Sequence, residues 1–178
     1  MFNQLLQQAF DNLHENKNEL ALLSLMPIFD KACKKTWPNK KVGERFREGV
    51  TETENIITYL MCSGSAVITD CTYGDLKLPQ IIYKYLRNTI IHEGEMPSNV
   101  SFTNEPKIII DEGNIIFPNQ FVIGFLVAAI GFECYKKEAA AVTQVGKLSL
   151  KGEEYFIKDL VGNHAVINNV INEKYGIQ

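Results

Sequence analysis

Apolar residues recur with a helical period through the first third of the chain. Between Phe2 and His14 they stand at every third or fourth position, which predicts an amphipathic helix. A second helix, from about Glu19 to Lys35, is apolar on most of its sides, as is typical of a central helix in a bundle. Pro27 should kink this helix or divide it in two. A third helix is expected from about Val42 to Met61.

The next part of the chain predicts a fourth helix followed by short strands. The helix should run from about Leu76 to Glu93, with Gly94 as its stop. After it, three short runs are typical of strands, and Glu112 and Gly113 are suited to a hairpin turn. These runs are Val100–Phe102, Lys107–Asp111 and Asn114–Phe117. We therefore expect a small β-hairpin insert at about residues 98–118, directly after the fourth helix.

Helical periodicity returns after the insert. A further helix is expected from about Asn119 to Glu138, and an uninterrupted apolar run from Phe121 to Ile130 lies inside it. That run is either a core helix or a dimer-interface helix, in which Gly124 and Ala128 would allow close approach of a neighbour.

The end of the chain is expected to form a helical extension at about residues 140–178. It contains two segments with helical patterns, Glu153–Leu160 and Ala165–Lys174. Neither a repeat nor a long linker divides the chain. The prediction is therefore a single, mainly α domain over residues 1–178, built as an up-and-down helical bundle.

Composition bears on location and on cofactors. No apolar run reaches the ~20 residues that a membrane span needs, and the first residues have no secretory-signal pattern. A cytoplasmic protein without a membrane-bound part is expected. The four cysteines form no C-x-x-C pair and have no histidine at zinc-ligand spacing. We expect reduced thiols, no metal and no cofactor.

The charge is distributed unevenly along the chain. The net charge of −3 is not that of a general nucleic-acid binder. The segment from Lys31 to Arg47 nevertheless holds seven basic residues and one acid, Glu44. It could bind RNA phosphates while Trp37 stacks on a base, or it could be a solvated helix end. The candidate RNA-binding residues are Lys31, Lys34, Lys35, Trp37, Lys40, Lys41, Arg45 and Arg47.

Three residues near the end of the fourth helix could carry chemistry. Arg87 and His92 are five residues apart, about 140° around an α-helix, so Arg87 should point away from the apolar face. Its long side chain could still reach round the helix or serve a second subunit. Asn88 is four residues from His92 and shares its face. A histidine can donate or accept a proton at physiological pH, and a guanidinium suits the charge of a phosphodiester. Such a pair could cleave RNA without a metal, with Asn88 fixing the imidazole or contacting the backbone. Alternatively, Arg87 is salt-bridged to Glu93 or Asp75, and His92 caps the helix end.

The ten residues from Tyr85 to Gly94 resemble the signature of HEPN domains. That signature is an Arg, a polar residue that is often Asn, a few further residues and a His, late on an apolar helix. HEPN domains are small up-and-down helical bundles that usually dimerise, so that the Arg and His of both chains line one cleft. Many are metal-independent endoribonucleases of toxin–antitoxin, abortive-infection and CRISPR systems. Others are inactive and serve as binding modules.

The resemblance implies a function and leaves an alternative open. It implies that Arg87 and His92 are catalytic, assisted by Asn88, in a homodimeric endoribonuclease of a toxin or defence system, with an antitoxin or another protein as partner. The alternative is a non-catalytic HEPN-like module that binds a protein or nucleotide partner. In that case Arg87 and His92 should be buried in local hydrogen bonds. The hairpin insert and the C-terminal extension depart from the minimal bundle.

Overall fold

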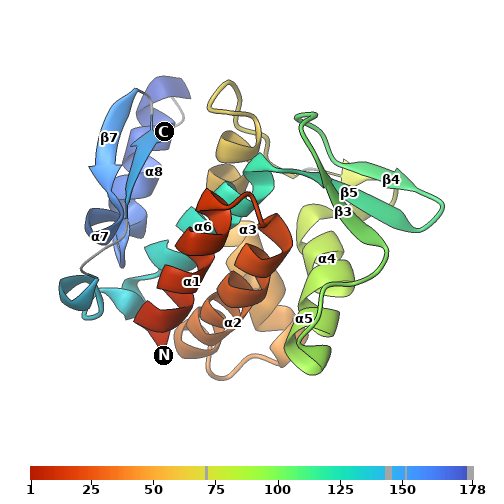
Figure 1. The fold of residues 1–178 in the computed structure, drawn as a ribbon, viewed down its shortest axis with the longest axis horizontal. Coiled ribbons are helices and arrows are strands. Elements are labelled where there is room, and N and C mark those ends of the chain that lie inside the picture. The colour runs from red at the N-terminus through yellow and green to blue at the C-terminus, as the bar shows by residue number, and fades with distance from the viewer. Residues whose placement is uncertain (71, 143–145, 151, 176–178) are drawn as a thin grey trace.

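Helices predicted from the first third of the sequence form the body of the molecule (Figure 1). The computed structural model describes residues 1–70, 72–142, 146–150 and 152–175, with the side chains of 173–175 excluded. The described chain is mainly helical, with small sheets. The first three helices are α1 (Phe2–His14), α2 (Asn18–Thr36) and α3 (Val42–Met61). The bounds predicted for α1 and α3 are confirmed.

The second helix is continuous through its proline. α2 runs without interruption from Asn18 to Thr36, so the predicted division at Pro27 is wrong. A proline removes a single backbone hydrogen bond to the preceding turn. Buried residues on both sides of Pro27, among them Met26 and Ile28, pack this helix into the core. Tertiary packing therefore holds the helix together across the proline.

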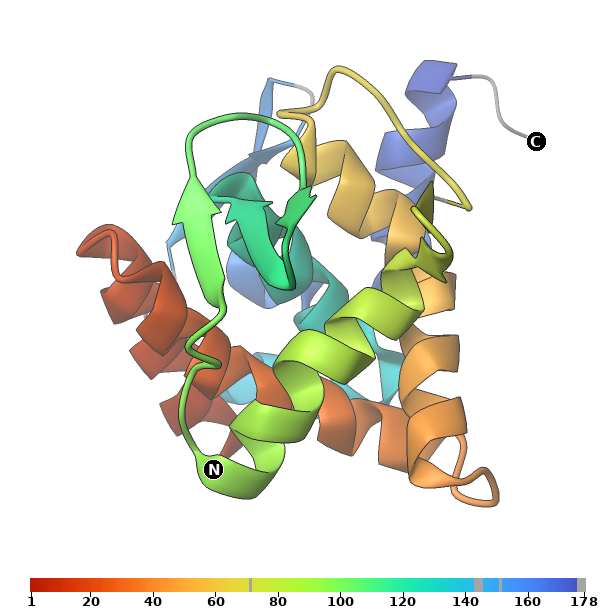
Figure 2. The same ribbon diagram turned by 90° about the vertical axis from the view of Figure 1, so that its right-hand side faces the viewer.

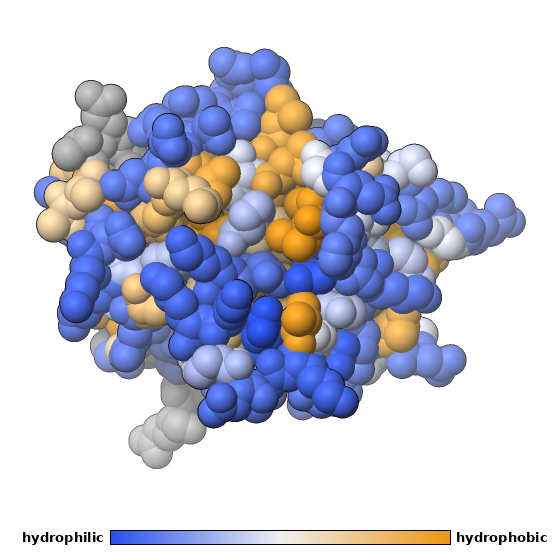
Figure 3. Space-filling model, turned by 90° about the horizontal axis from the view of Figure 1, so that it is seen from below, coloured by the Kyte–Doolittle hydropathy of each residue, from blue (hydrophilic) through white to orange (hydrophobic). Residues whose placement is uncertain are grey.

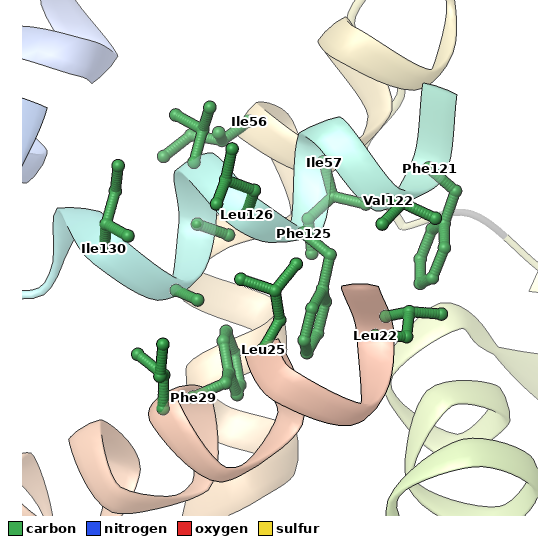
Figure 4. Packing of buried hydrophobic residues seen from close by; sticks show 14 of the residues in the cluster. Leu22, Leu25, Phe29, Ile56, Ile57, Phe121, Val122, Phe125, Leu126 and Ile130 are labelled. Carbon is green, nitrogen blue, oxygen red and sulfur yellow. The ribbon is translucent and has the colours of Figure 1, made fainter. Parts of the chain in front are cut away.

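The centre of the core is α6 (Gln120–Gly131), which packs against both α2 and α3 (Figure 4). A side-chain carbon at Gly124 would lie 2.7 Å from the carbonyl oxygen of Ile57, so the backbones of α6 and α3 nearly touch. Gly124 thus allows the close approach that was predicted, but the neighbour is a helix of the same chain. α6 is a core helix and not an open interface.

The core helix ends earlier than predicted. The expected helix to Glu138 is wrong beyond Gly131, because Phe132 leaves the helical conformation and a 3₁₀ turn, η2 (Glu133–Tyr135), follows. The N–H of Gly162 donates to the carbonyl oxygen of Ile130 at 2.9 Å. Part of the C-terminal region thus supplies a backbone partner to the last turn of the helix.

The fourth helix lies across the body, beside α3 at its start and α2 at its end (Figure 2). It follows a two-stranded ribbon, β1 (Thr72–Tyr73) and β2 (Leu76–Lys77). The helix consists of α4 (Leu78–Ile81), a π-helical stretch η1 (Ile82–Arg87), and α5 (Asn88–Glu93). Gly94 ends it with a φ of 74°, as predicted.

The insert after this helix is a three-stranded sheet. Its strands are β3 (Val100–Thr103), β4 (Ile109–Asp111) and β5 (Asn114–Pro118), in the order β3-β5-β4. The predicted hairpin of β4 and β5 is confirmed, and its turn has positive φ at both Glu112 and Gly113. β3 adds in parallel to β5, whose Ile115 and Phe117 are buried against the body.

The C-terminal region contains strands as well as helices. The predicted helix over Glu153–Leu160 is wrong in its first half, because residues 153–156 form β7 (Glu153–Phe156). This strand pairs antiparallel with β6 (Lys147–Leu150). The remaining helices are α7 (Ile157–Leu160) and α8 (His164–Tyr175), and the latter confirms the last predicted helix. Within the described chain, no helix is both long and apolar enough to cross a bilayer.

Candidate functional site

Arg87 lies inside the protein, contrary to the expectation from a regular helix. Its exposed fraction is 5%, so the prediction that it points away from the apolar face is wrong. The cause is η1, in which the N–H of Asn88 bonds to the carbonyl oxygen of Tyr83, five residues back. An extra residue in one turn rotates the later part of the helix by about 100° relative to a regular helix. The rotation brings Arg87 toward α2.

The buried guanidinium has a carboxylate partner on another helix. Nε of Arg87 donates to Oδ1 of Asp30 at 3.0 Å, and the Asp30 side chain is 17% exposed. Asp30 belongs to α2, so the partner is neither Glu93 nor Asp75, as the alternative interpretation supposed. The guanidinium carbon also lies 5.7 Å from the ring centre of Tyr83, one turn earlier in its own helix. Arg87 is thus fixed from two sides.

His92 is exposed and meets Arg87 despite the angle between them. Nη1 of Arg87 lies 3.4 Å from Nε2 of His92, because the long arginine side chain spans the turn. If Nη1 donates here, Nε2 must carry a lone pair. The backbone N–H of Gly94 closes the helix by bonding to Ile90, while the His92 imidazole contacts Arg87. Asn88 is half-buried at the start of α5, and its side chain makes no hydrogen bond within the described chain.

One residue of the basic segment joins this pair. The guanidinium carbon of Arg47, on α3, lies 5.2 Å from the same Tyr83 ring. We call Asp30, Arg47, Tyr83, Arg87 and His92 the Arg–His cluster. It combines α2, α3 and the fourth helix near the end where α2 passes into α3 and α5 terminates. That end faces the viewer in Figure 3, and hydrophilic residues cover most of it.

Other residues of the basic segment have different surroundings. Trp37 is half-buried, with its ring edge-on to Phe132, so it is partly a packing residue. Nζ of Lys40 lies 6.0 Å from the Trp37 ring and 3.0 Å from a carboxylate oxygen of Glu48. Nζ of Lys35 lies 5.2 Å from the ring of Tyr135.

The remaining basic residues lie on α2, before α3 and in the first turn of α3. Lys31 and Lys34 are exposed on α2. Lys41 is exposed, and its N–H donates to Glu44 at 3.2 Å at the start of α3. Arg45 is half-buried, and its Nε has no hydrogen-bond partner within the described chain. Of the predicted basic segment, Arg47 is the residue that belongs to the Arg–His cluster, through its contact with Tyr83.

Sequence reasoning missed Asp30 and Tyr83. Tyr83 could have been found, because residues four apart on a helix are neighbours, and Tyr83 precedes Arg87 by four. Asp30 gave a weaker signal. It is an acid in an otherwise apolar stretch of α2, and a buried acid needs a partner. The sequence does not name that partner, which lies 57 residues away.

The thiols have the properties of packing residues. Burial is the main cause that raises the pKa of Cys33, and it also raises the pKa of Cys134. Cys33, Cys62 and Cys134 are not in disulfides, whereas Cys71 lies outside the described residues. Among the described residues, no three His, Cys, Asp or Glu side chains are grouped so that they could hold a metal ion.

Among the clefts that lie elsewhere in the described chain, two are between the helical body and β6. One, of about 690 Å³, is lined by residues that include Tyr59, Gln120 and Leu148. The other, of about 380 Å³, is lined by residues that include His14, Gln120 and Leu148. Neither is lined by a member of the Arg–His cluster, whose histidine lies on the open surface.

Comparison with known proteins gives one match. The model of the Rv1289 family matches residues 2–178. No curated protein and no solved structure matches the chain. The match covers the helical body, the three-stranded insert and the C-terminal hairpin together. The chain therefore belongs to the Rv1289 family.

Proposed function

We propose that the chain is a HEPN-like, metal-independent endoribonuclease that works in the cytoplasm as a homodimer. The observation that supports this most is the contact between a fixed guanidinium and an exposed imidazole. Nη1 of Arg87 lies 3.4 Å from Nε2 of His92, while Asp30 holds the other side of the guanidinium. A permanent cation beside a proton-transfer group is the combination that phosphodiester cleavage needs.

The proposed reaction uses the 2′-hydroxyl of the RNA as nucleophile. A phosphate bound by Arg87 takes the place of the Arg87–His92 contact and leaves Nε2 of His92 free. Nε2 accepts the proton of the 2′-hydroxyl, and the 2′-oxygen forms a bond to phosphorus. The bond from phosphorus to the 5′-oxygen breaks, and that oxygen leaves with a proton from the second histidine of the dimer or from water. The products are a 2′,3′-cyclic phosphate and a 5′-hydroxyl end.

The proposal extends to the architecture and the partners. The helical body would be a HEPN-like bundle in which two copies of the fourth helix meet and the two Arg–His pairs line one cleft. Asn88, half-buried one residue after Arg87, would orient the RNA backbone or the imidazole. An antitoxin or another protein would bind over this end and hold the nuclease inactive.

The test is cleavage of RNA by the purified protein in the presence of EDTA. We expect wild type to cleave, and His92→Ala to lower the rate by about 10²–10⁴-fold, as for loss of a general acid or base. His14→Ala is the matched control, since His14 is also an exposed histidine near the end of a helix. Equal rates for wild type and His92→Ala would exclude His92 as the proton-transfer group.

The burial of Arg87 favours a second candidate function. A guanidinium that is only 5% exposed and paired with Asp30 can serve simply to tie η1 of the fourth helix to α2. The chain would then be a non-catalytic HEPN-like module that binds a protein or nucleotide. This second candidate function predicts that the wild-type protein leaves RNA intact with or without metal ions. Arg87→Ala would still lower the free energy of unfolding.

A further inference from the structure

Two arginines from different helices share one aromatic ring. The guanidinium carbons of Arg47 and Arg87 lie 5.2 Å and 5.7 Å from the ring centre of Tyr83. The ring is itself held in place, because it packs against Phe46 with ring centres 5.8 Å apart. A side-chain carbon at Gly43 would lie 3.0 Å from the Tyr83 hydroxyl oxygen, so the absence of a side chain there makes room for the ring. The tyrosine thus fixes where both cations lie.

Among the described residues, only one of these two guanidiniums forms an ion pair. Asp30 is paired with Arg87. The acids near Arg47 on its own helix are engaged elsewhere, because Glu48 pairs with Lys40 and Glu44 accepts the N–H of Lys41. In the part of the chain that the structure describes, Arg47 has no carboxylate within ion-pair distance. Two cations held at one ring, with a carboxylate paired to Arg87 alone, favour a bound anion.

The positions of the two guanidiniums match a ligand with more than one phosphate. Arg87 points to His92 and is the cation that the proposed reaction places on the scissile phosphate. Arg47 lies on the other helix that contacts Tyr83 and does not contact His92, so it is placed for a different phosphate. A nucleic-acid strand carries one negative charge per nucleotide, so it presents neighbouring phosphates to both. Arginine suits this role because its planar group binds phosphate while it stacks on an aromatic ring.

We propose that Arg47 and Tyr83 form a second phosphate subsite beside the Arg87–His92 pair, so that an oligoribonucleotide is a better substrate than a dinucleotide. This inference rests on the proposed function. Arg87 binds the scissile phosphate, and Arg47 binds a neighbouring one. Tyr83 sets the spacing between the two guanidiniums.

Substrate length tests the subsite directly. A dinucleoside monophosphate has a single phosphate, whereas an RNA hexamer has neighbours on both sides of the scissile one. We expect Arg47→Ala to lower kcat/KM on the hexamer by about 10-fold, the value of one charge-assisted contact, and to change it less than about 2-fold on the dinucleotide. Lys137→Ala, which removes an exposed cation elsewhere, should alter neither. Equal losses on both substrates, or no loss on either, would overturn the subsite.

Binding without cleavage separates this inference from the proposed function. The His92→Ala protein is titrated with a fluorescent RNA hexamer at several salt concentrations, with and without Arg47→Ala. Loss of Arg47 should raise Kd about 10-fold and make the salt dependence shallower by about 0.7, as for one phosphate contact on a single strand. Arg47→Lys should restore the slope but only part of the affinity. Binding that depends on Arg47, together with no cleavage by wild type, would overturn the proposed function and support the subsite. Binding that is unchanged by Arg47→Ala would overturn the subsite.

Discussion

Two histidines at different places in this molecule have opposite surroundings. His92, on α5, is exposed and meets the guanidinium of Arg87 at 3.4 Å. His164, at the start of α8, is half-buried, with its Nε2 3.3 Å from the side-chain nitrogen of Asn168. The first contacts a fixed cation at the surface. The second contacts a neutral amide where α8 packs against α3 and α6.

The difference shows how the surroundings assign a role to one residue type. Burial lowers the pKa of His164, although Glu52 and Glu133 act in the opposite direction, so this imidazole is neutral at pH 7. Asn168, its neighbour, also accepts a hydrogen bond from Asn55 of α3 at 2.8 Å. His164 is therefore part of a network that fixes α8, whereas the exposed imidazole of His92 is open to a ligand. A histidine alone predicts neither role.

The largest expected effect is a loss of RNA cleavage when His92, but not His164, is replaced. We expect His92→Gln to lower RNA cleavage by about 10²–10⁴-fold, because the proton-transfer group is lost. His164→Gln keeps a polar side chain in the α8 network and should change cleavage by less than about 2-fold. Both variants are assayed with the same RNA in EDTA, after circular dichroism shows that each is folded. A comparable loss in the two variants would erase the functional distinction between the histidines.

The elements that the sequence predicted well are those in which one pattern dominates. α1 and α3 have the predicted bounds because their apolar residues keep a helical period from end to end. The hairpin of β4 and β5 was predictable because Gly113, followed by Asn114, suits a turn with positive φ. In these segments, local preference and tertiary packing require the same conformation.

The errors arose where contacts between distant residues decide the structure. β7 was predicted as helix, but Glu153–Phe156 pairs with β6, and a short segment follows whichever partner is available. Arg87 was expected outside because the wheel assumed 3.6 residues per turn, and η1 breaks that assumption. The candidate site was therefore predicted by residue type and position in sequence, while its orientation and its partners Asp30 and Tyr83 required the fold.

The ion pair of the Arg–His cluster and the amide pair of α8 should differ in stability. Arg87→Ala leaves Asp30 partly buried without its cation, which should cost about 3–5 kcal/mol of unfolding free energy. Asn168→Ala removes a neutral hydrogen bond to Asn55 and should cost about 1 kcal/mol. Urea unfolding of both variants measures the two losses. The double variant Arg87→Met with Asp30→Leu should recover much of the first loss, because no unpaired charge remains.

Two glycines, one after α5 and one before α8, allow a matched test of how much backbone conformation and packing contribute to stability. Gly94 follows α5 with a φ of 74°, and a side-chain carbon there would have no neighbour within 4 Å. Gly162 precedes α8 with a φ of 71°, and the same carbon would lie 2.4 Å from the backbone of Lys136. Gly94→Ala should cost about 1 kcal/mol for the left-handed conformation alone. Gly162→Ala should cost about 3 kcal/mol, because a clash with backbone is added.

Thermal or urea unfolding distinguishes these glycine variants. Equal losses would mean that the turn before α8 can move away from Lys136 without cost. A larger loss at Gly162 would show that this turn is packed against the backbone of Lys136, just after η2.

The smallest expected effect concerns pH and His164. Because burial lowers the pKa of His164 in the folded chain, the unfolded chain binds a proton more readily near pH 6.5, the ordinary value. The stability that depends on the neutral imidazole is therefore present above pH 6.5 and is lost as the pH falls below it. The urea midpoint of wild type should fall between about pH 7 and about pH 5.5. The fall should be smaller in His164→Gln, which has no proton to bind at this position. Since every carboxylate is common to both proteins, the difference between the two pH dependences reports His164 itself, and identical dependences would contradict the assignment of this histidine as a neutral packing residue.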